Sequence, residues 1–191
     1  MNLVILYRCG AGGEFLTWVL GQQQGFVTQK IMITPGNKWC LTNPAIKLFD
    51  ATGEFDTQPG AVNLCRFHAN WLEDLNTDTL RLSREHIHTW KDTVFLVLWP
   101  TTEESNQWQN ELAVQKVPER PASGTTLESK HLRYHLAGQR YLLVDPYQLF
   151  HDYQTAQHTA TWIDQQMGTN CDVDTMYSLF SAWRHMNNLT N

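Results

Sequence analysis

The sequence predicts an α/β fold of three layers, with a mostly parallel sheet of about four to five strands and helices on both faces. Short runs rich in apolar residues at 3–7, 93–99 and 140–145 are typical of strands buried in a parallel sheet. Helical segments alternate with these runs, which indicates strand–helix–strand units. The 191 residues suffice for one sizeable core, so we expect a single domain over residues 1–191.

The elements follow from the pattern of apolar residues and breakers. A further strand is expected at residues 61–67, while Pro and Gly indicate loops over residues 25–60. We expect helices at residues 14–20, 45–49, 71–75, 102–114, 127–136, 146–150, 152–167 and 173–186. Thr102 suits an N-cap, with Glu103 and Glu104 in the first turn, and Asp145 suits a cap for the helix that begins at Pro146.

The composition excludes several classes of protein. Fourteen basic and nineteen acidic residues give a net charge of -5. The sequence contains no long basic run of the kind that would indicate a nucleic-acid partner. No apolar stretch approaches the ~20 residues that span a bilayer, and the first residues lack the pattern of a signal peptide, so we expect a cytoplasmic protein. The four Cys are scattered and the His pairs lack further ligands nearby, so no metal site is expected.

The glycine turn, residues 10–13, follows the first strand directly. Gly10, Gly12 and Gly13 would let backbone N–H groups converge on an anion at the start of a helix. The Walker pattern is absent, however, and the Glu14 carboxylate would repel a phosphate by roughly a kcal/mol. Two interpretations remain open: an anion site, or a tight turn in which Glu14 is a favourable first-turn acid.

Other polar residues follow the ends of the predicted strands. In open α/β folds ligands bind beyond the carboxyl ends of the strands. We therefore expect residues 9–14, His68, residues 99–105 and residues 145–147 to lie near one edge of the sheet.

Three segments in order resemble the sulfotransferase-like branch of P-loop proteins. Residues 7–16 look like the loop that holds the 5′-phosphosulfate of the donor, and are closest to short GAGG-x-FL versions in phage and bacterial proteins. Residues 94–105 are similar to the family's strand, Pro and downstream Ser at the 3′-phosphate. Residues 141–152, followed by a helix and Gly168, resemble its late strand and acidic turn.

The resemblance implies a donor, 3′-phosphoadenosine 5′-phosphosulfate, and residues that bind it. These are Arg8, Gly10, Ala11, Gly12, Gly13, Glu14, Phe15 and Ser105. Arg8 would neutralise charge, and His68 would be the general base that takes the proton of an acceptor hydroxyl. A surface or hydrogen-bonding role is the alternative for His68.

The departures from the family pattern support a second hypothesis. Ala11 and Glu14 stand where the family carries a basic residue and a hydroxyl, and Leu98–Trp99 replaces its Arg. The chain is therefore either a sulfotransferase acting on a hydroxyl of a small molecule or protein, or a non-catalytic P-loop-fold binding or assembly module. The module could be phage-encoded, in the virion or host cytoplasm, with a partner on a Trp-rich surface. A nucleotide kinase is disfavoured because the Lys and Ser/Thr that handle phosphate are absent.

Overall fold

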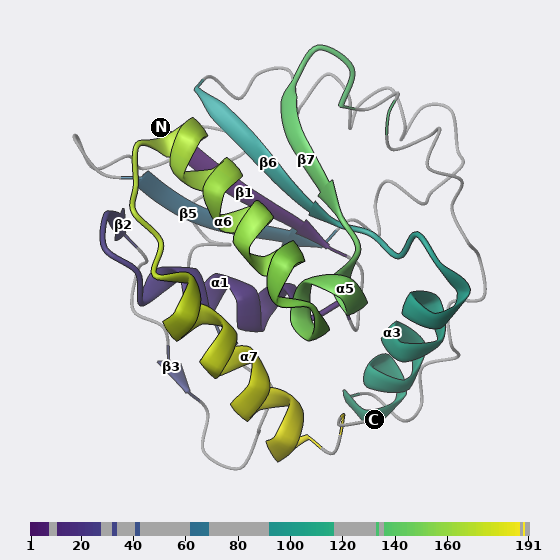
Figure 1. The fold of residues 1–191 in the computed structure, drawn as a ribbon. Coiled ribbons are helices and arrows are strands. Elements are labelled where there is room, and N and C mark those ends of the chain that lie inside the picture. Colours follow the sequence, from purple (N-terminus) through teal and green to yellow (C-terminus); the bar gives the residue numbers. More distant parts are fainter. Residues whose placement is uncertain are drawn as a thin grey trace.

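A parallel sheet forms the centre of the protein (Figure 1). The computed structural model describes residues 1–7, 11–27, 32–33, 41–42, 62–68, 92–116, 133, 136–187 and 189. The strands of the sheet, in spatial order, are β2 (Phe26–Val27), β5 (Val62–His68), β1 (Asn2–Tyr7), β6 (Thr93–Leu98) and β7 (Arg140–Val144). Every pairing in this sheet is parallel. A separate antiparallel pair joins β3 (Met32–Ile33) to β4 (Leu41–Thr42).

The parallel pairing confirms the predicted α/β class. The pairing joins five strands, and side chains are described along the whole of three of them, β1, β6 and β7. These three strands are neighbours, with Asn2 opposite Thr93 and Leu98 opposite Val144. In the full sheet, β1, the first strand of the chain, lies at the inner position, between β5 and β6.

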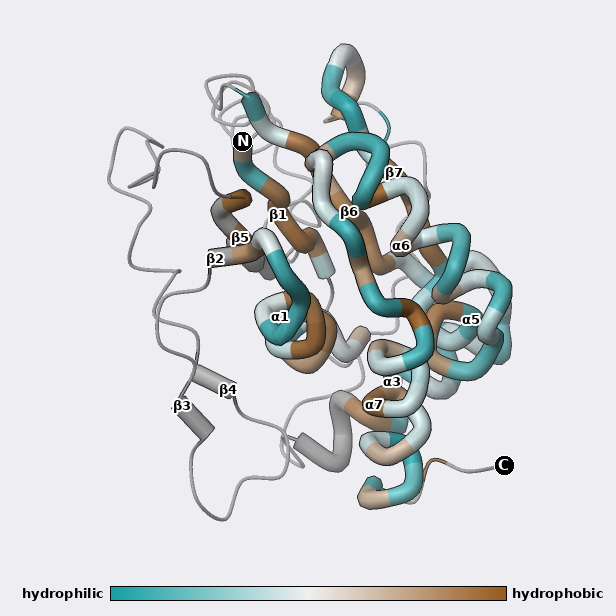
Figure 2. The backbone as a smooth tube through the Cα atoms, turned by 60° about the vertical axis from the view of Figure 1, so that its left-hand side comes forward, coloured by the Kyte–Doolittle hydropathy of each residue, from teal (hydrophilic) through white to brown (hydrophobic). Residues whose placement is uncertain are grey.

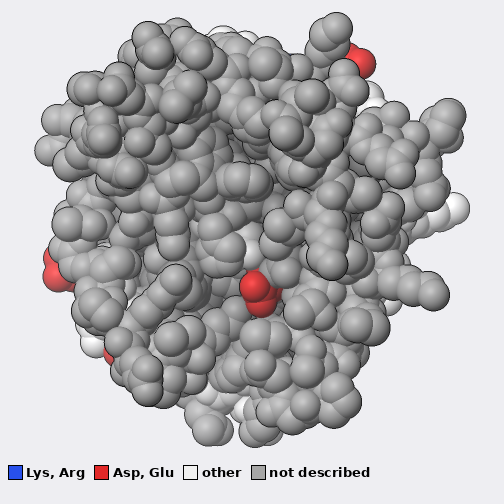
Figure 3. Space-filling model, turned by 180° about the vertical axis from the view of Figure 1, so that it is seen from behind, with Lys and Arg blue, Asp and Glu red and all other residues white. Residues whose placement is uncertain are grey.

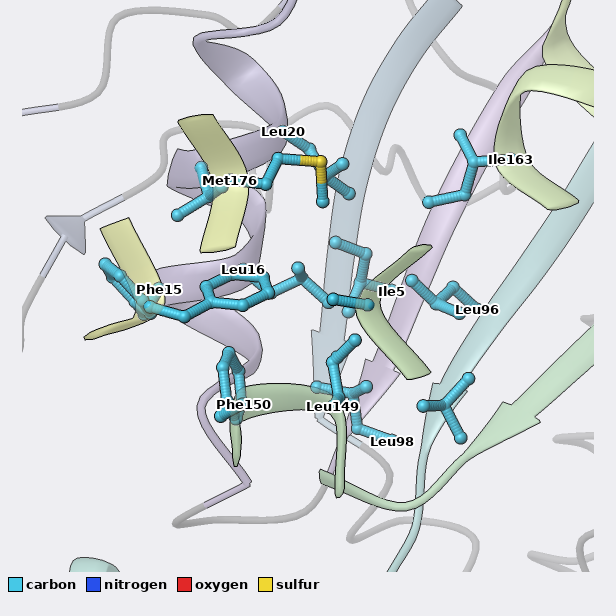
Figure 4. Close-up of a cluster of buried hydrophobic side chains, with 14 of the residues drawn as sticks. Ile5, Phe15, Leu16, Leu20, Leu96, Leu98, Leu149, Phe150, Ile163 and Met176 are labelled. Atoms are coloured by element: carbon cyan, nitrogen blue, oxygen red, sulfur yellow. The ribbon is translucent and has the colours of Figure 1, made fainter. Parts of the chain in front are cut away.

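Four helices cover one face of the sheet: α1 (Gly13–Gly21), α5 (Pro146–His151), α6 (Tyr153–Met167) and α7 (Val173–Met186). Their apolar side chains meet those of the strands in one cluster, where Phe15 and Leu16 from α1 lie with Phe150 from α5 and Met176 from α7 (Figure 4). The helix α3 (Glu103–Lys116) lies beside α5, beyond the end of β6 (Figure 1).

The side chains on the second face of the sheet are also buried. Val4 and Leu6 of β1, and Phe95 and Val97 of β6, have no exposed surface. Burial on both faces explains why these strands are continuous apolar runs rather than alternating ones. The expectation of helices on this second face falls outside the described residues.

Most predicted boundaries within the described residues are correct to one or two positions. α7 covers the predicted residues 173–186. α6 ends at Met167 and is followed by its C-cap Gly168, whose left-handed φ of 69° suits glycine. Asp145 caps α5 by accepting from Tyr147 N and Gln148 N. The expected helices at 45–49 and 71–75, and most of the one at 127–136, lie outside the described residues.

The outer surface of the described elements is polar. Apolar residues concentrate along the strands and α1, whereas hydrophilic residues dominate the outer turns of α6 (Figure 2). Seen from behind, the described residues contribute only small areas of surface, among them isolated acidic groups (Figure 3). In the part of the chain that is described, no helix has the length and apolarity to cross a membrane.

Candidate functional site

The carboxyl ends of four strands meet in one row across the sheet. Tyr7 at the end of β1 lies opposite both His68 of β5 and Leu98 of β6, and Leu98 lies opposite Val144 of β7. β1 pairs with β5 on one side and with β6 on the other, so the strand order changes direction at β1. In open α/β sheets, ligands bind beyond the carboxyl ends of the strands at such a point. We call this row of strand ends the site edge.

The glycine turn leads from the site edge into α1. Gly12 is the N-cap of α1 and has a left-handed backbone with a φ of 70°, which glycine adopts at little cost. Among the described residues, no side chain caps this helix. Ala11 has no exposed surface, and Arg8 and Gly10 lie outside the described residues.

Two aromatic rings fill the space beside the glycines. A Cβ on Gly12 would lie 2.6 Å from Phe150 Cε2, and a Cβ on Gly13 would overlap the ring of Tyr7. Both rings are buried, with Tyr7 2% exposed and Phe150 fully enclosed. Packing therefore requires glycine at both positions, a reason that the sequence alone did not reveal.

Two other predicted binding residues differ sharply in exposure. Glu14 is partly exposed in the first turn of α1, where a carboxylate interacts favourably with the helix dipole. Phe15 is buried, and its ring stacks on Trp183 with centroids 4.6 Å apart and planes inclined by 8°. The geometry makes Phe15 part of the core, where its side chain faces α7.

Ser105 lies in the first turn of α3 and has no exposed surface. Its backbone N–H donates to Thr102 Oγ1 at 3.1 Å, which confirms the expected cap at Thr102. Its own Oγ is buried, and among the described residues it has no hydrogen-bond partner; the same holds for Trp108 Nε1 one turn later. Buried polar atoms without partners are rare in folded proteins and call for an explanation.

Asp145 links the end of β7 to the loop between β6 and α3. Its Oδ2 accepts from Thr101 N at 2.7 Å and from Thr101 Oγ1 at 2.8 Å, while Oδ1 accepts from Tyr147 N at 3.0 Å. The carboxylate is 8% exposed, and the hydrogen bonds to its charge are of the stronger kind. The sequence indicated the cap but gave no sign of the bond to Thr101, 44 positions away.

His151, which sequence reasoning did not single out, lies at the end of α5. Its ring stacks on Tyr147 with centroids 4.1 Å apart and meets the edge of Trp108 at 5.7 Å. Nδ1 lies 2.8 Å from the Tyr147 carbonyl oxygen, so the tautomer protonated at Nδ1 donates to it. Burial, assisted by the charge of Arg184, lowers the pKa of His151. Burial and the hydrogen bond to Glu104 raise the pKa of Tyr147.

The structure places the predicted base and the described tryptophans in different parts of the fold. His68 is the last residue of β5 and so lies on the site edge, although its side chain is outside the described part. Trp99 and Trp108 are 3% and 7% exposed and belong to the interior instead of an exposed surface. Trp71 and Trp90 lie outside the described residues.

Among the described residues, no group of three His, Cys, Asp or Glu side chains could hold a metal ion. No protein-family model matches the sequence, and no curated protein matches it.

Proposed function

We propose that the chain is a sulfotransferase-like protein that binds 3′-phosphoadenosine 5′-phosphosulfate at the site edge and sulfates a hydroxyl group. The observation that carries this proposal is the start of α1. A left-handed glycine, without a side-chain cap among the described residues, begins this helix at the carboxyl end of β1. The N-terminus of a helix is a favourable place for a phosphate, and ligands of open α/β sheets generally bind beyond the carboxyl ends of the strands.

The described residues offer partners that fit such a donor. The N–H groups of the first turn of α1 could donate to the phosphosulfate. The buried Ser105 hydroxyl, which has no hydrogen-bond partner among the described residues, could donate to a phosphate of the donor. Arg8, next to the glycine turn in sequence, would supply positive charge. The donor contributes the transferable sulfuryl group. His68 would accept the proton from the acceptor hydroxyl, and the aligned N–H groups would stabilise charge on the departing phosphate.

Isothermal titration with 3′-phosphoadenosine 5′-phosphate tests this proposal directly. We expect micromolar binding by the wild type and a loss of at least tenfold in Arg8→Ala, about 1.4 kcal/mol. Arg140→Ala is the matched control, because exposed Arg140 lies at the opposite, amino end of β7. Equal losses in the two variants would indicate a general effect of charge, contrary to a role for Arg8.

One specific observation favours the second candidate, a non-catalytic module built on the same fold. Tyr7 and Phe150 explain why Gly12 and Gly13 are glycines, without any ligand. The partly exposed Glu14 adds a negative charge at the start of α1. Absence of binding at millimolar 3′-phosphoadenosine 5′-phosphate would overturn the donor proposal and leave the module as the better account.

A further inference from the structure

The short helix α5 contacts both loops that frame the end of β1. At one end Asp145 binds Thr101 of the β6–α3 loop, and at the other the ring of Phe150 lies against Gly12 of the glycine turn. We infer that α5 is a brace: Asp145 and Phe150 are positioning residues that fix the two loops relative to each other. The effect on a ligand rests on the proposed function, whereas the brace itself can be tested without a ligand.

The structure of α5 should couple the positions of its two ends. It is a six-residue helix, about 9 Å long, that begins with Pro146, whose ring fixes φ. Asp145 holds its first turn through Tyr147 N and Gln148 N. Leu149 and Phe150 are fully buried at its other end. Neither end can shift far without disturbing the core.

The Asp145 end holds the β6–α3 loop by two bonds to one residue. Thr101 N and Thr101 Oγ1 both donate to Oδ2, at 2.7 and 2.8 Å. Just before Thr101, the N–H of Trp99 donates to the Val144 carbonyl at the end of β7, at 3.0 Å. The position of the loop, and with it the start of α3, is therefore tied to α5.

The Phe150 end supports the glycine turn by packing. Its Cε2 and Cζ are the atoms nearest to where a Gly12 Cβ would be, at 2.6 and 2.9 Å. The same ring also packs on Trp108 of α3, with centroids 5.9 Å apart, and on Phe15 of α1 at 6.1 Å. Phe150 thus touches the helices that follow both loops, which gives the brace a second connection between them.

Two variants each remove one of the contacts by which α5 holds a loop, and each variant has a matched control. Asp145→Asn keeps one oxygen that can cap α5, but the NH2 group that replaces the second oxygen cannot accept from Thr101 N. Asp172→Asn is its control, since Asp172 caps α7 with Thr175 N and Oγ1 as donors. Phe150→Leu is compared with Phe180→Leu, because Phe180 is equally buried but packs on Phe150 and Phe15 rather than on the glycine turn.

The first measurement uses the ligand-free protein. In amide NMR spectra we expect Asp145→Asn and Phe150→Leu each to shift the resonances of both Gly12–Gly13 and Thr101–Thr102, with small shifts at these positions in the controls. If Asp145→Asn moves the loop residues and leaves Gly12 and Gly13 unchanged, the brace is wrong. The same conclusion follows if all four variants shift the two loops alike.

The second measurement is the affinity for 3′-phosphoadenosine 5′-phosphate. We expect each brace variant to bind roughly tenfold more weakly than its control, measured under conditions in which both members of the pair are folded. Equal affinities within each pair would overturn positioning by α5. A wild type that does not bind would overturn the proposed function instead, and the NMR comparison would still decide whether the brace exists.

Discussion

The ring of Phe150 occupies the space that a side chain at Gly12 would need, although the two residues lie on different elements of the fold. The contact joins the first turn of the chain to a helix that follows the last strand of the sheet. It also means that the glycine at position 12 is required twice, once by its left-handed φ of 70° and once by the neighbouring ring. These two requirements can be separated by mutation.

Gly12→Ala should destabilise the protein more than Gly168→Ala. Both glycines have a φ near 70°, so each substitution costs roughly 1 kcal/mol in the backbone. Nothing lies within 4 Å of a Cβ at Gly168, whereas a methyl at Gly12 would meet Phe150 and cost a further ~1–3 kcal/mol. Urea unfolding measures both free energies. Gly12→Ala combined with Phe150→Leu should recover part of the extra loss; equal costs at the two glycines would contradict the contact.

The free energy of unfolding should decrease as the pH falls through the range in which His151 titrates. The fold lowers the pKa of His151 below 6.5, so the unfolded chain takes up this proton first. Stability from the neutral imidazole is therefore complete above about pH 6.5 and declines as the pH falls toward the lower pKa of the folded state. The free energy of unfolding of His151→Gln should vary less over this window. Identical pH profiles for the two proteins would show that His151 does not contribute.

Acid stability should depend on the caps of α6 and α7. Hydrogen bonds from Thr155 and Thr175 lower the pKa values of Asp152 and Asp172 below 3.8. Their contribution is present above pH 3.8 and is lost as the pH falls through the lower pKa of each folded carboxyl. Asp172→Asn retains a cap that does not titrate, so its stability should decline less between pH 5 and pH 2. Circular dichroism during acid titration tests this; an unchanged acid midpoint would contradict it.

Cys171 should be unreactive in the native protein. Burial and the neighbouring Asp164 raise the pKa of its thiol to about 12, and the residue is only 7% exposed. At pH 8 roughly one thiol in 10,000 would be ionised, and the thiolate is the reactive form. Mass spectrometry of the peptide that contains Cys171, after iodoacetamide treatment, should show alkylation only when denaturant is added. Comparable alkylation in native and unfolded protein would overturn this expectation.

The sequence predicted well those elements whose signal is local. Met176, Leu179, Phe180 and Trp183 recur at helical spacing along α7. Leu179 is partly buried, and the other three are buried. The apolar run at residues 93–98 needs no partner to be read as a strand. The ends of the parallel strands could also be placed at one edge, because parallel strands share a direction.

The contacts that shape the candidate site could not be predicted in this way. Phe150 next to Gly12 depends on where α5 packs, and the bond from Thr101 to Asp145 depends on the pairing of β6 with β7. His151 reads in sequence as one more polar residue after an apolar pair, and only the fold surrounds it with Tyr147 and Trp108. The roles of Arg8, His68 and Ser105 toward a ligand stay predictions.

The inner position of β1 has a consequence for biosynthesis. Asn2 pairs with Thr93, 91 positions further along the chain, so β1 leaves the ribosome well before its β6 neighbour has been made. Until then its apolar residues Leu3–Leu6 have no strand on that side, and exposed apolar segments of nascent chains favour aggregation. Sheets that depend on distant pairings also form slowly. Production at low temperature, or together with a chaperone that shields nascent chains, should therefore raise the yield of native protein.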